Sequence, residues 1–300
     1  MNHNTPAKQP LIVMAWIIML AISDLPDIFI SELGGSIPAW MFWAKAGFLV
    51  AILGVTLLWK VIRPLWEYAL ILLTLFLALA FTGLVRNTSW FQSAFNYAGV
   101  PFFTGYAAIM ALDICVALAV IAALWLIKRK RSAFFLVKGQ MDAPIEPTGW
   151  LGIQEGESWR TFGWIFTGAA SLLVAIPTFL SIPLSGEVIA RALPLLPAAV
   201  LFAAVNAFTE EVYFRSSLLS TLHRVIGKTH ALLLMSVFFG LGHWLYGSPP
   251  GIIGFLMTGF LAWLIGRSML ETRGFAWPWT IHFVPDVVIF ISYALLYVQA

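Results

Sequence analysis

The sequence predicts an all-α fold, a polytopic bundle of about nine transmembrane helices, and its composition is the basis of this prediction. Of the 300 residues, 61% are hydrophobic and 10% are charged, and the mean hydropathy is +0.90. Soluble globular proteins have about a quarter of their residues charged and just under half apolar. The 17 Lys and Arg and 14 Asp and Glu residues are too few to cover a water-soluble protein of this length, whereas a lipid-facing surface carries almost no charge.

A helix that crosses a bilayer needs about 20 apolar residues, and windows of that length place the elements along the chain. The first window contains Asp24, Pro26 and Asp27, so it is the weakest of the spans, and without it the chain has eight. The expected spans lie near residues 11–30, 39–59, 65–85, 102–127, 161–183, 194–222, 230–246, 251–270 and 276–299.

The basic residues between these spans predict their orientation. With a cytoplasmic N-terminus, most of the 17 Lys and Arg residues lie on the cytoplasmic side, and only Arg86 and Arg191 lie in external connections. Cytoplasmic loops of membrane proteins are enriched in Lys and Arg, so we expect the N-terminus inside and the C-terminus outside. The net charge of +3 then reflects topology against membrane lipids, and no nucleic-acid partner is expected.

One long polar stretch, residues 128–160, divides the chain. It opens with Lys-Arg-Lys-Arg and contains several Pro and Gly residues, which is typical of a basic cytoplasmic linker. Before it lies a four-span region, residues 1–127, of unassigned role; after it lies a second membrane region, residues 161–300. No internal repeat is visible, which disfavours an inverted-repeat transporter. The single cysteine, Cys115, excludes an intramolecular disulfide framework.

Ionisable residues inside the spans need an explanation, because each costs about 2.5–3.5 kcal/mol on insertion. In the N-terminal half they occur singly at no informative spacing. We expect them to pair between helices, for example Lys45 with an aspartate. These residues are Asp24, Asp27, Lys45, Glu67 and Asp113.

In the C-terminal half, two adjacent glutamates lie within an apolar run. Glu211 and Arg215 are four residues apart, so on a helix they can neutralise each other. Glu210 points about 100° away from Glu211 and has no basic residue three or four positions away. A desolvated carboxylate without a cation is suited to act as a general base near neutral pH.

Two of the later spans each carry a pair of residues at the same four-residue spacing. Phe239 and His243 share a face of one helix, and His282 and Asp286 share a face of the last helix, where the carboxylate can orient the imidazole. Glu210 and His243 lie about 20 Å, Asp286 about 15 Å and His282 about 9 Å from the cytoplasmic ends of their helices. Three helices can therefore bring these side chains into one polar layer, as an active site requires.

With these three motifs, EExxxR, FxxxH and HxxxD, the chain resembles the CPBP family of intramembrane endopeptidases, which contains the CAAX proteases and bacteriocin-processing enzymes. The motifs occur in the family's order over residues 195–290, about a third of the chain. The resemblance implies a protease domain within residues 161–300. It also implies hydrolysis of a peptide bond in a membrane-associated protein or peptide by a multi-pass protein of the cell membrane.

The resemblance also implies the role of each residue. Glu210 and His243 activate the attacking water, and His282 with Asp286 stabilises the oxyanion. Glu211 with Arg215 forms a structural ion pair, and Phe239 supports the histidine that follows it. Asp286 stands where asparagine also occurs in the family, and a carboxylate donates a hydrogen bond only when protonated, so His282 is the expected donor.

Two questions stay open at this point. A glutamate with two histidines is also a possible zinc set, Glu210, His243 and His282, although a mechanism without a cofactor is favoured and no HExxH motif is present. The same residues would also be compatible with a catalytically inactive scaffold or bacteriocin-immunity factor. A proton-coupled transporter is disfavoured, because it would spread polar residues along a path.

Overall fold

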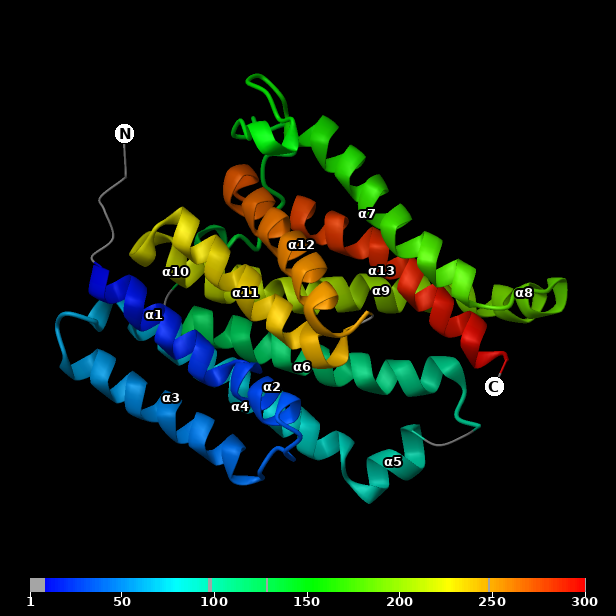
Figure 1. Cartoon of the computed structure of the whole chain (residues 1–300), viewed down its shortest axis with the longest axis horizontal. Helices are drawn as coiled ribbons and strands as arrows, with labels where there is room; N and C mark the ends of the chain where they lie inside the picture. Colours follow the sequence, from blue (N-terminus) through cyan, green and yellow to red (C-terminus); the bar gives the residue numbers. More distant parts are fainter. Residues whose placement is uncertain (1–8, 97–98, 128, 248, 300) are drawn as a thin grey trace. The chain divides into compact units, whose positions relative to one another are not determined.

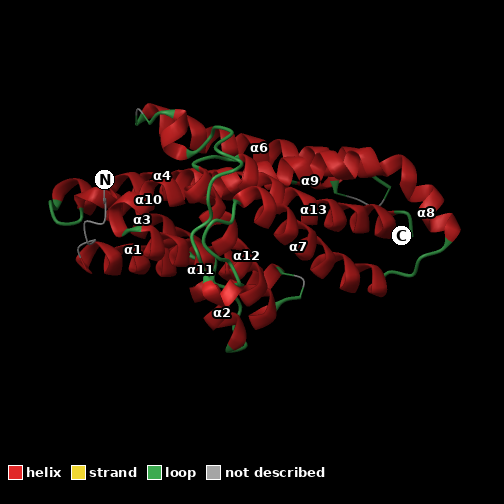
Figure 2. Ribbon diagram, turned by 90° about the horizontal axis from the view of Figure 1, so that it is seen from above, coloured by secondary structure: helices red, strands yellow, loops and turns green. Residues whose placement is uncertain are grey.

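The computed structural model describes residues 9–96, 99–127, 129–247 and 249–299. In these residues the chain is helical, and the only β pairing consists of two isolated bridges (Figure 2). A helix satisfies its own backbone hydrogen bonds, which is what a segment inside hydrocarbon requires. The prediction of an all-α polytopic bundle is confirmed.

Eight helices in the described part of the chain are long and apolar enough to cross a membrane. A ninth span is obtained when α1 (Gln9–Ile22) and α2 (Leu25–Glu32), which are bent by 50°, are taken as one. Each lies at a predicted span. The eight are α3 (Trp40–Leu58), η1 with α4 (Arg63–Leu65 and Trp66–Arg86), α6 (Phe102–Leu126), α7 (Trp159–Ser181), the stretch Gly186–Ile226, α11 (Lys228–Tyr246), α12 (Gly251–Thr272) and α13 (Ala276–Tyr297).

The bend in the first span has a local cause. Pro26 lies in the first turn of α2, where its missing N–H costs nothing, but its ring cannot continue the preceding helix. The hydroxyl of Ser23 donates to the carbonyl of Leu20 at 3.0 Å and accepts from the N–H of Leu25 at 3.2 Å. These bonds close the break, and the two aspartates of the span, Asp24 and Asp27, lie on either side of the proline.

The stretch Gly186–Ile226 is not one regular helix, as the sequence had suggested for residues 194–222. It contains α8 (Gly186–Ala192), the 3₁₀ turn η4 (Leu193–Leu195), α9 (Leu196–Glu211), the π-helix η5 (Val212–Leu219) and α10 (Ser220–Ile226). The hydroxyls of Ser217 and Ser220 donate to carbonyls of the preceding turn, a bond that competes with regular helix geometry. The π-helix begins directly after Glu211, and π segments often mark functional sites.

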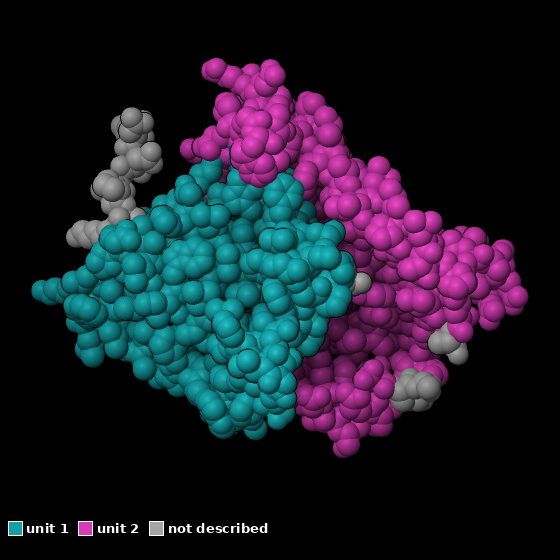
Figure 3. Space-filling model, viewed as in Figure 1, with its two compact units in different colours: residues 1–77, 120–134, 213–267 teal, residues 78–119, 135–212, 268–300 magenta. Residues whose placement is uncertain are grey.

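The chain divides into two compact units (Figure 3). Unit 1 contains the residues up to 77 together with 120–134 and 213–267. In it α1 contacts α2, α3 and α11, and α2 also contacts α11 (Figure 1). The division falls inside α4, α6 and α12, and between Val212 and Tyr213.

Unit 2 contains residues 78–119, 135–212 and 268–300. Here α13 packs against α9 and α7 (Figure 1), and α6 joins them through a buried aromatic cluster centred on Phe102, Phe202 and Phe290. The remaining short helix of this unit is α5 (Ser89–Phe95). The packing of α9 on α13 brings two of the predicted motifs together.

The predicted linker holds the start of α13. Between η2 (Arg131–Phe134) and η3 (Gly149–Leu151), its backbone is bonded to the turn between α12 and α13, with Phe275 N–H donating to the Val137 carbonyl at 2.7 Å. The Trp277 indole N–H donates to the Met141 carbonyl at 2.9 Å. A Cβ on Gly274 would lie 2.2 Å from the Cα of Gly139, so only glycine permits this approach.

The prediction that first-half charges pair between helices is confirmed at three places. Lys45 Nζ lies 2.6 Å from Asp27 Oδ2 and also donates to the Ser23 carbonyl at 2.8 Å. Each unit also contains one further ion pair of these first-half charges. They join Arg86 Nη2 to Asp113 Oδ1 at 2.5 Å, and Arg129 Nε to Glu67 Oε2 at 2.7 Å.

Candidate active site

The helix pair α9 and α13 places a histidine among three carboxylates. His282 Nδ1 lies 2.8 Å from Glu211 Oε1, and its Nε2 lies 3.6 Å from Glu210 Oε2 and 3.7 Å from Asp286 Oδ2. His282 and Asp286 are 6% exposed and Glu211 is 0% exposed. These four predicted residues therefore meet in unit 2.

Glu211 has a contact that the sequence analysis did not predict. The predicted partner of His282 was Asp286, one turn along the same helix, yet the shortest contact of the ring is with Glu211 on α9. When Nδ1–H donates to the Glu211 carboxylate, Nε2 is the nitrogen that faces Glu210 and Asp286. A carboxylate on one ring nitrogen fixes both the tautomer and the orientation of the imidazole.

Asn206 is a further site residue that the sequence analysis missed. Its amide Nδ2 donates to Asp286 Oδ2 at 3.0 Å and to Glu210 Oε1 at 3.3 Å, so one amide joins two carboxylates from two helices. A signal was present, because Asn206 lies four residues before Glu210 on an otherwise apolar helix. The indole N–H of Trp279 donates to the Ala204 carbonyl at 3.0 Å and fixes α13 against α9 close to His282.

The helix α6, which precedes the linker, also contributes a charge to this group. Asp113 interacts electrostatically with Glu210. Met110, one turn before Asp113, belongs to the core cluster formed with Ala199 and Ala203 of α9, and Arg86 holds the Asp113 carboxylate. The ion pair of Asp113 and Arg86, which the sequence analysis did not connect with the motifs, thus interacts with Glu210.

A second group of predicted residues lies in unit 1, around Phe239 on α11. The guanidinium of Arg215 lies 4.6 Å from the centroid of the Phe239 ring, and the centroids of Phe239 and His243 are also 4.6 Å apart. His243 Nδ1 lies 3.0 Å from the Phe239 carbonyl oxygen. Phe239 is thus packed between a cation and an imidazole, and a desolvated cation–π contact contributes about 2 kcal/mol.

Helix α11 lies against its neighbours at the glycines of the FGLGH segment. A Cβ on Gly240 would be 2.7 Å from the Phe255 carbonyl oxygen of α12, and a Cβ on Gly242 would be 3.5 Å from Asp24 Oδ2. At Gly240 the neighbour is therefore the backbone of α12 at a distance that excludes a side chain, whereas at Gly242 it is an aspartate side chain at ordinary van der Waals distance.

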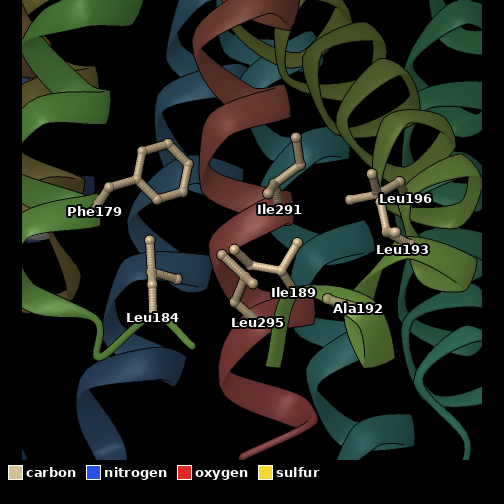
Figure 4. Close-up of a pocket in the computed structure, with 8 residues that line it drawn as sticks. All are labelled: Phe179, Leu184, Ile189, Ala192, Leu193, Leu196, Ile291 and Leu295. Atoms are coloured by element: carbon tan, nitrogen blue, oxygen red, sulfur yellow. The ribbon is translucent and has the colours of Figure 1, made fainter. Parts of the chain in front are cut away.

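An apolar pocket lies farther along α13 in unit 2 (Figure 4). It has a volume of about 420 Å³ and lies between α7, α8, α9 and α13, with Phe179, Ile291 and Leu295 among its lining residues. All its lining side chains are apolar, so the pocket supplies no group for the chemistry.

The described residues contain no group of three or more His, Cys, Asp or Glu arranged to hold a metal ion.

The fold and these side chains define a class, an integral membrane protein with carboxylates and histidines on its apolar helices. Residues 191–288 match the family described as type II CAAX prenyl endopeptidase Rce1-like. This match confirms the resemblance seen in the three motifs, and it covers about a third of the chain. No curated protein and no solved structure matches the chain.

Proposed function

We propose that this protein is an intramembrane endopeptidase in which a water molecule activated by Glu210 and His243 hydrolyses a peptide bond of a membrane-associated protein or peptide. The observation that supports it best is the group of His282, Glu210, Glu211 and Asp286 inside the Rce1-like domain. The cell membrane is the proposed location, with membrane lipids around the helices.

In the proposed reaction Glu210 is the general base. It takes a proton from water as the oxygen attacks the carbonyl carbon, and the same proton passes to the leaving amide nitrogen when the tetrahedral intermediate collapses. His243 donates Nδ1–H to the Phe239 carbonyl, which leaves Nε2 to accept a hydrogen bond from the attacking water. Asn206 supports the geometry, because it holds Glu210 by its Oε1 and leaves Oε2 for the proton.

His282 is the proposed donor to the oxyanion. Because Nδ1–H is directed to Glu211, Nε2 carries a proton only in the imidazolium form of the ring. The three surrounding carboxylates stabilise that form. Asp286, held by Asn206 at 3.0 Å, then acts on the reaction through His282.

We propose this mechanism without a metal cofactor, and a chelation assay tests the choice against the zinc set Glu210, His243 and His282. With no metal required, the purified enzyme stays active after treatment with phenanthroline and without stoichiometric zinc by elemental analysis. Inactivation by the chelator with recovery on adding zinc, at about one metal per chain, would replace the glutamate mechanism by a metalloprotease.

The experiment that tests the function is hydrolysis of a library of membrane-anchored peptides by the purified protein, compared with the Glu210→Gln variant. Glutamine preserves shape but removes the base, so turnover is expected to fall by about 10²–10⁴-fold at unchanged expression and thermal stability. Glu187→Gln is the matched control, since Glu187 is exposed on α8 and pairs only with Arg191 among the ion pairs described. Loss of activity in both variants, or in neither, would contradict the role of Glu210.

A further inference from the structure

The bent first span carries two aspartates with different surroundings. Asp27 is bound by Lys45. Asp24 occupies the N-cap position of α2, yet its side chain makes no capping hydrogen bond to that helix. Its carboxylate is directed instead to α11, where Oδ2 lies 3.5 Å from the position of a Cβ on Gly242.

The approach of α2 to α11 is fixed at a second point. The Trp244 indole N–H donates to Glu32 Oε1 at 2.9 Å, and both α1 and α2 contact α11 (Figures 1 and 2). Gly242 and Trp244 are the two residues on either side of His243. The bend of the first span therefore brings a carboxylate to the segment that carries the proposed catalytic histidine, and Asp24 interacts electrostatically with His243.

We propose that Asp24 is a positioning residue for His243, which orients the imidazole and, through its negative charge, strengthens the hydrogen bond that Nε2 accepts from the attacking water. This inference rests on the proposed protease function. The charged groups that interact with Asp24 are Lys45, Asp27 and His243, and Lys45 is engaged by Asp27 at 2.6 Å. Of these groups, His243 is the one that takes part in the proposed reaction.

This proposal gives the region before the linker a role in the site. The Rce1-like domain begins at residue 191, and Asp24 lies far before it in the sequence. A carboxylate beside an imidazole that accepts a hydrogen bond from the attacking water raises the rate of the chemical step through orientation and electrostatics, while it leaves substrate binding unchanged. The signature of such a residue is therefore a change in kcat without a change in KM.

The test compares Asp24→Asn with Glu32→Gln. Both remove one negative charge from the same bent span, and glutamine at position 32 keeps an acceptor for Trp244. Asp24→Asn is expected to lower kcat by about 10–100-fold with KM unchanged, and Glu32→Gln to leave both within about threefold of the parent. Asp24→Glu retains the charge but displaces it, so its kcat is expected between those of the parent and the asparagine variant. A parent-like kcat in Asp24→Asn, or an equal loss in Glu32→Gln, overturns the role of Asp24.

A second readout does not depend on activity. In ¹⁵N-histidine NMR spectra, with the His243 signal assigned through His243→Gln, the ring nitrogens of His243 are expected to shift in Asp24→Asn and to stay unchanged in Glu32→Gln. If the asparagine variant does not fold, Asp24→Glu is used for the same comparison. An inactive parent protein with the expected shift would reject the protease function and keep the Asp24–His243 interaction, whereas unchanged His243 signals would overturn the interaction itself.

Discussion

Arg215 is a fully buried cation whose guanidinium lies over the Phe239 ring. Arg215→Ala should lower folded yield as well as activity. It removes the cation–π contact, and it removes the basic residue nearest in sequence to the buried carboxylate of Glu211. Removing one partner from a buried charged group costs about 3–5 kcal/mol. The measurement is thermal unfolding of the variant in detergent.

Arg191→Ala is the matched control for Arg215, since Arg191 is exposed on α8 and an exposed ion pair contributes about 0–1 kcal/mol. Its melting temperature should stay close to that of the parent. An Arg215→Ala protein as abundant and as heat-stable as Arg191→Ala would show that the packing of Phe239 does not need the cation.

Asp286 gives a pH-dependent prediction. The imidazolium of His282 is the proposed donor, and a neighbouring carboxylate favours that form. Asp286→Asn should therefore be active at low pH. As the pH is raised, the His282 ring should lose its proton, and the enzyme its activity, at a lower pH in the variant than in the parent. The profile of kcat/KM against pH should show its alkaline limb displaced to lower pH. Glu211 still holds Nδ1 at 2.8 Å, so the limb should move rather than disappear.

A direct role of residue 286 as the oxyanion donor would give the opposite pH dependence. If the side chain at position 286 itself donates to the oxyanion, an amide is a better donor than an ionised carboxylate. Asp286→Asn would then match or exceed the parent at neutral and alkaline pH, with an unshifted limb, and His282 would lose its role as the donor.

Spacing along single helices identified the candidate site residues, and spacing also sets the limit of what could be predicted. The pairs Phe239 with His243 and His282 with Asp286 are visible at four-residue spacing on one helix, and the structure places both pairs in contact range. Glu211 with His282, and Asn206 with Asp286, join α9 to α13. Contacts between helices depend on helix rotation and register, which a hydrophobic sequence does not encode in any local pattern.

At the scale of the element, helices α11 and α12 meet at Gly240. A Cβ there would lie 2.7 Å from the Phe255 carbonyl and 2.9 Å from its ring, so Gly240→Ala must push the two helices apart. Overpacking of this kind costs about 1–3 kcal/mol, and because His243 is on the same helix, activity should fall with stability.

The control for Gly240 is Gly83→Ala on α4, where a Cβ would meet nothing within 4 Å. Alanine is favoured over glycine in a helix by about 1 kcal/mol, so this variant should be as stable as the parent or more stable. Chemical denaturation of both variants in the same detergent measures the difference. Equal stability of the two variants would mean that α11 and α12 tolerate a wider separation.

Elements were predicted best where a long apolar run determines them and least well where the backbone departs from a regular α-helix. The eight long helices agree with the spans read from hydropathy. The π-helix Val212–Leu219 and the 50° bend at Asp24 depend on side-chain hydroxyls and a proline acting on the local backbone. Both irregular segments adjoin residues to which we assign a role in the proposed site, Glu211 and Asp24.

At the scale of the molecule, the orientation in the membrane decides which side substrate enters from. The predicted topology places the basic run from Lys128 to Arg131 and the loop around Glu155 in the cytoplasm, and the loop around Ser36 outside. This orientation is expected because Lys and Arg residues are retained on the cytoplasmic side when the helices insert into the membrane. His282 lies about 9 Å from the cytoplasmic end of its helix in this arrangement, so the site would open to the cytoplasm.

Cysteine labelling tests this orientation directly. In a Cys115→Ala background, which removes the single native cysteine, Ser36→Cys and Glu155→Cys each place one thiol on an exposed residue. In intact cells a membrane-impermeant maleimide should modify position 36 and not position 155, and after permeabilisation it should modify both. Labelling of position 155 in intact cells, with position 36 protected, would reverse the topology and place His282 near the external surface, where only an externally exposed substrate could reach it.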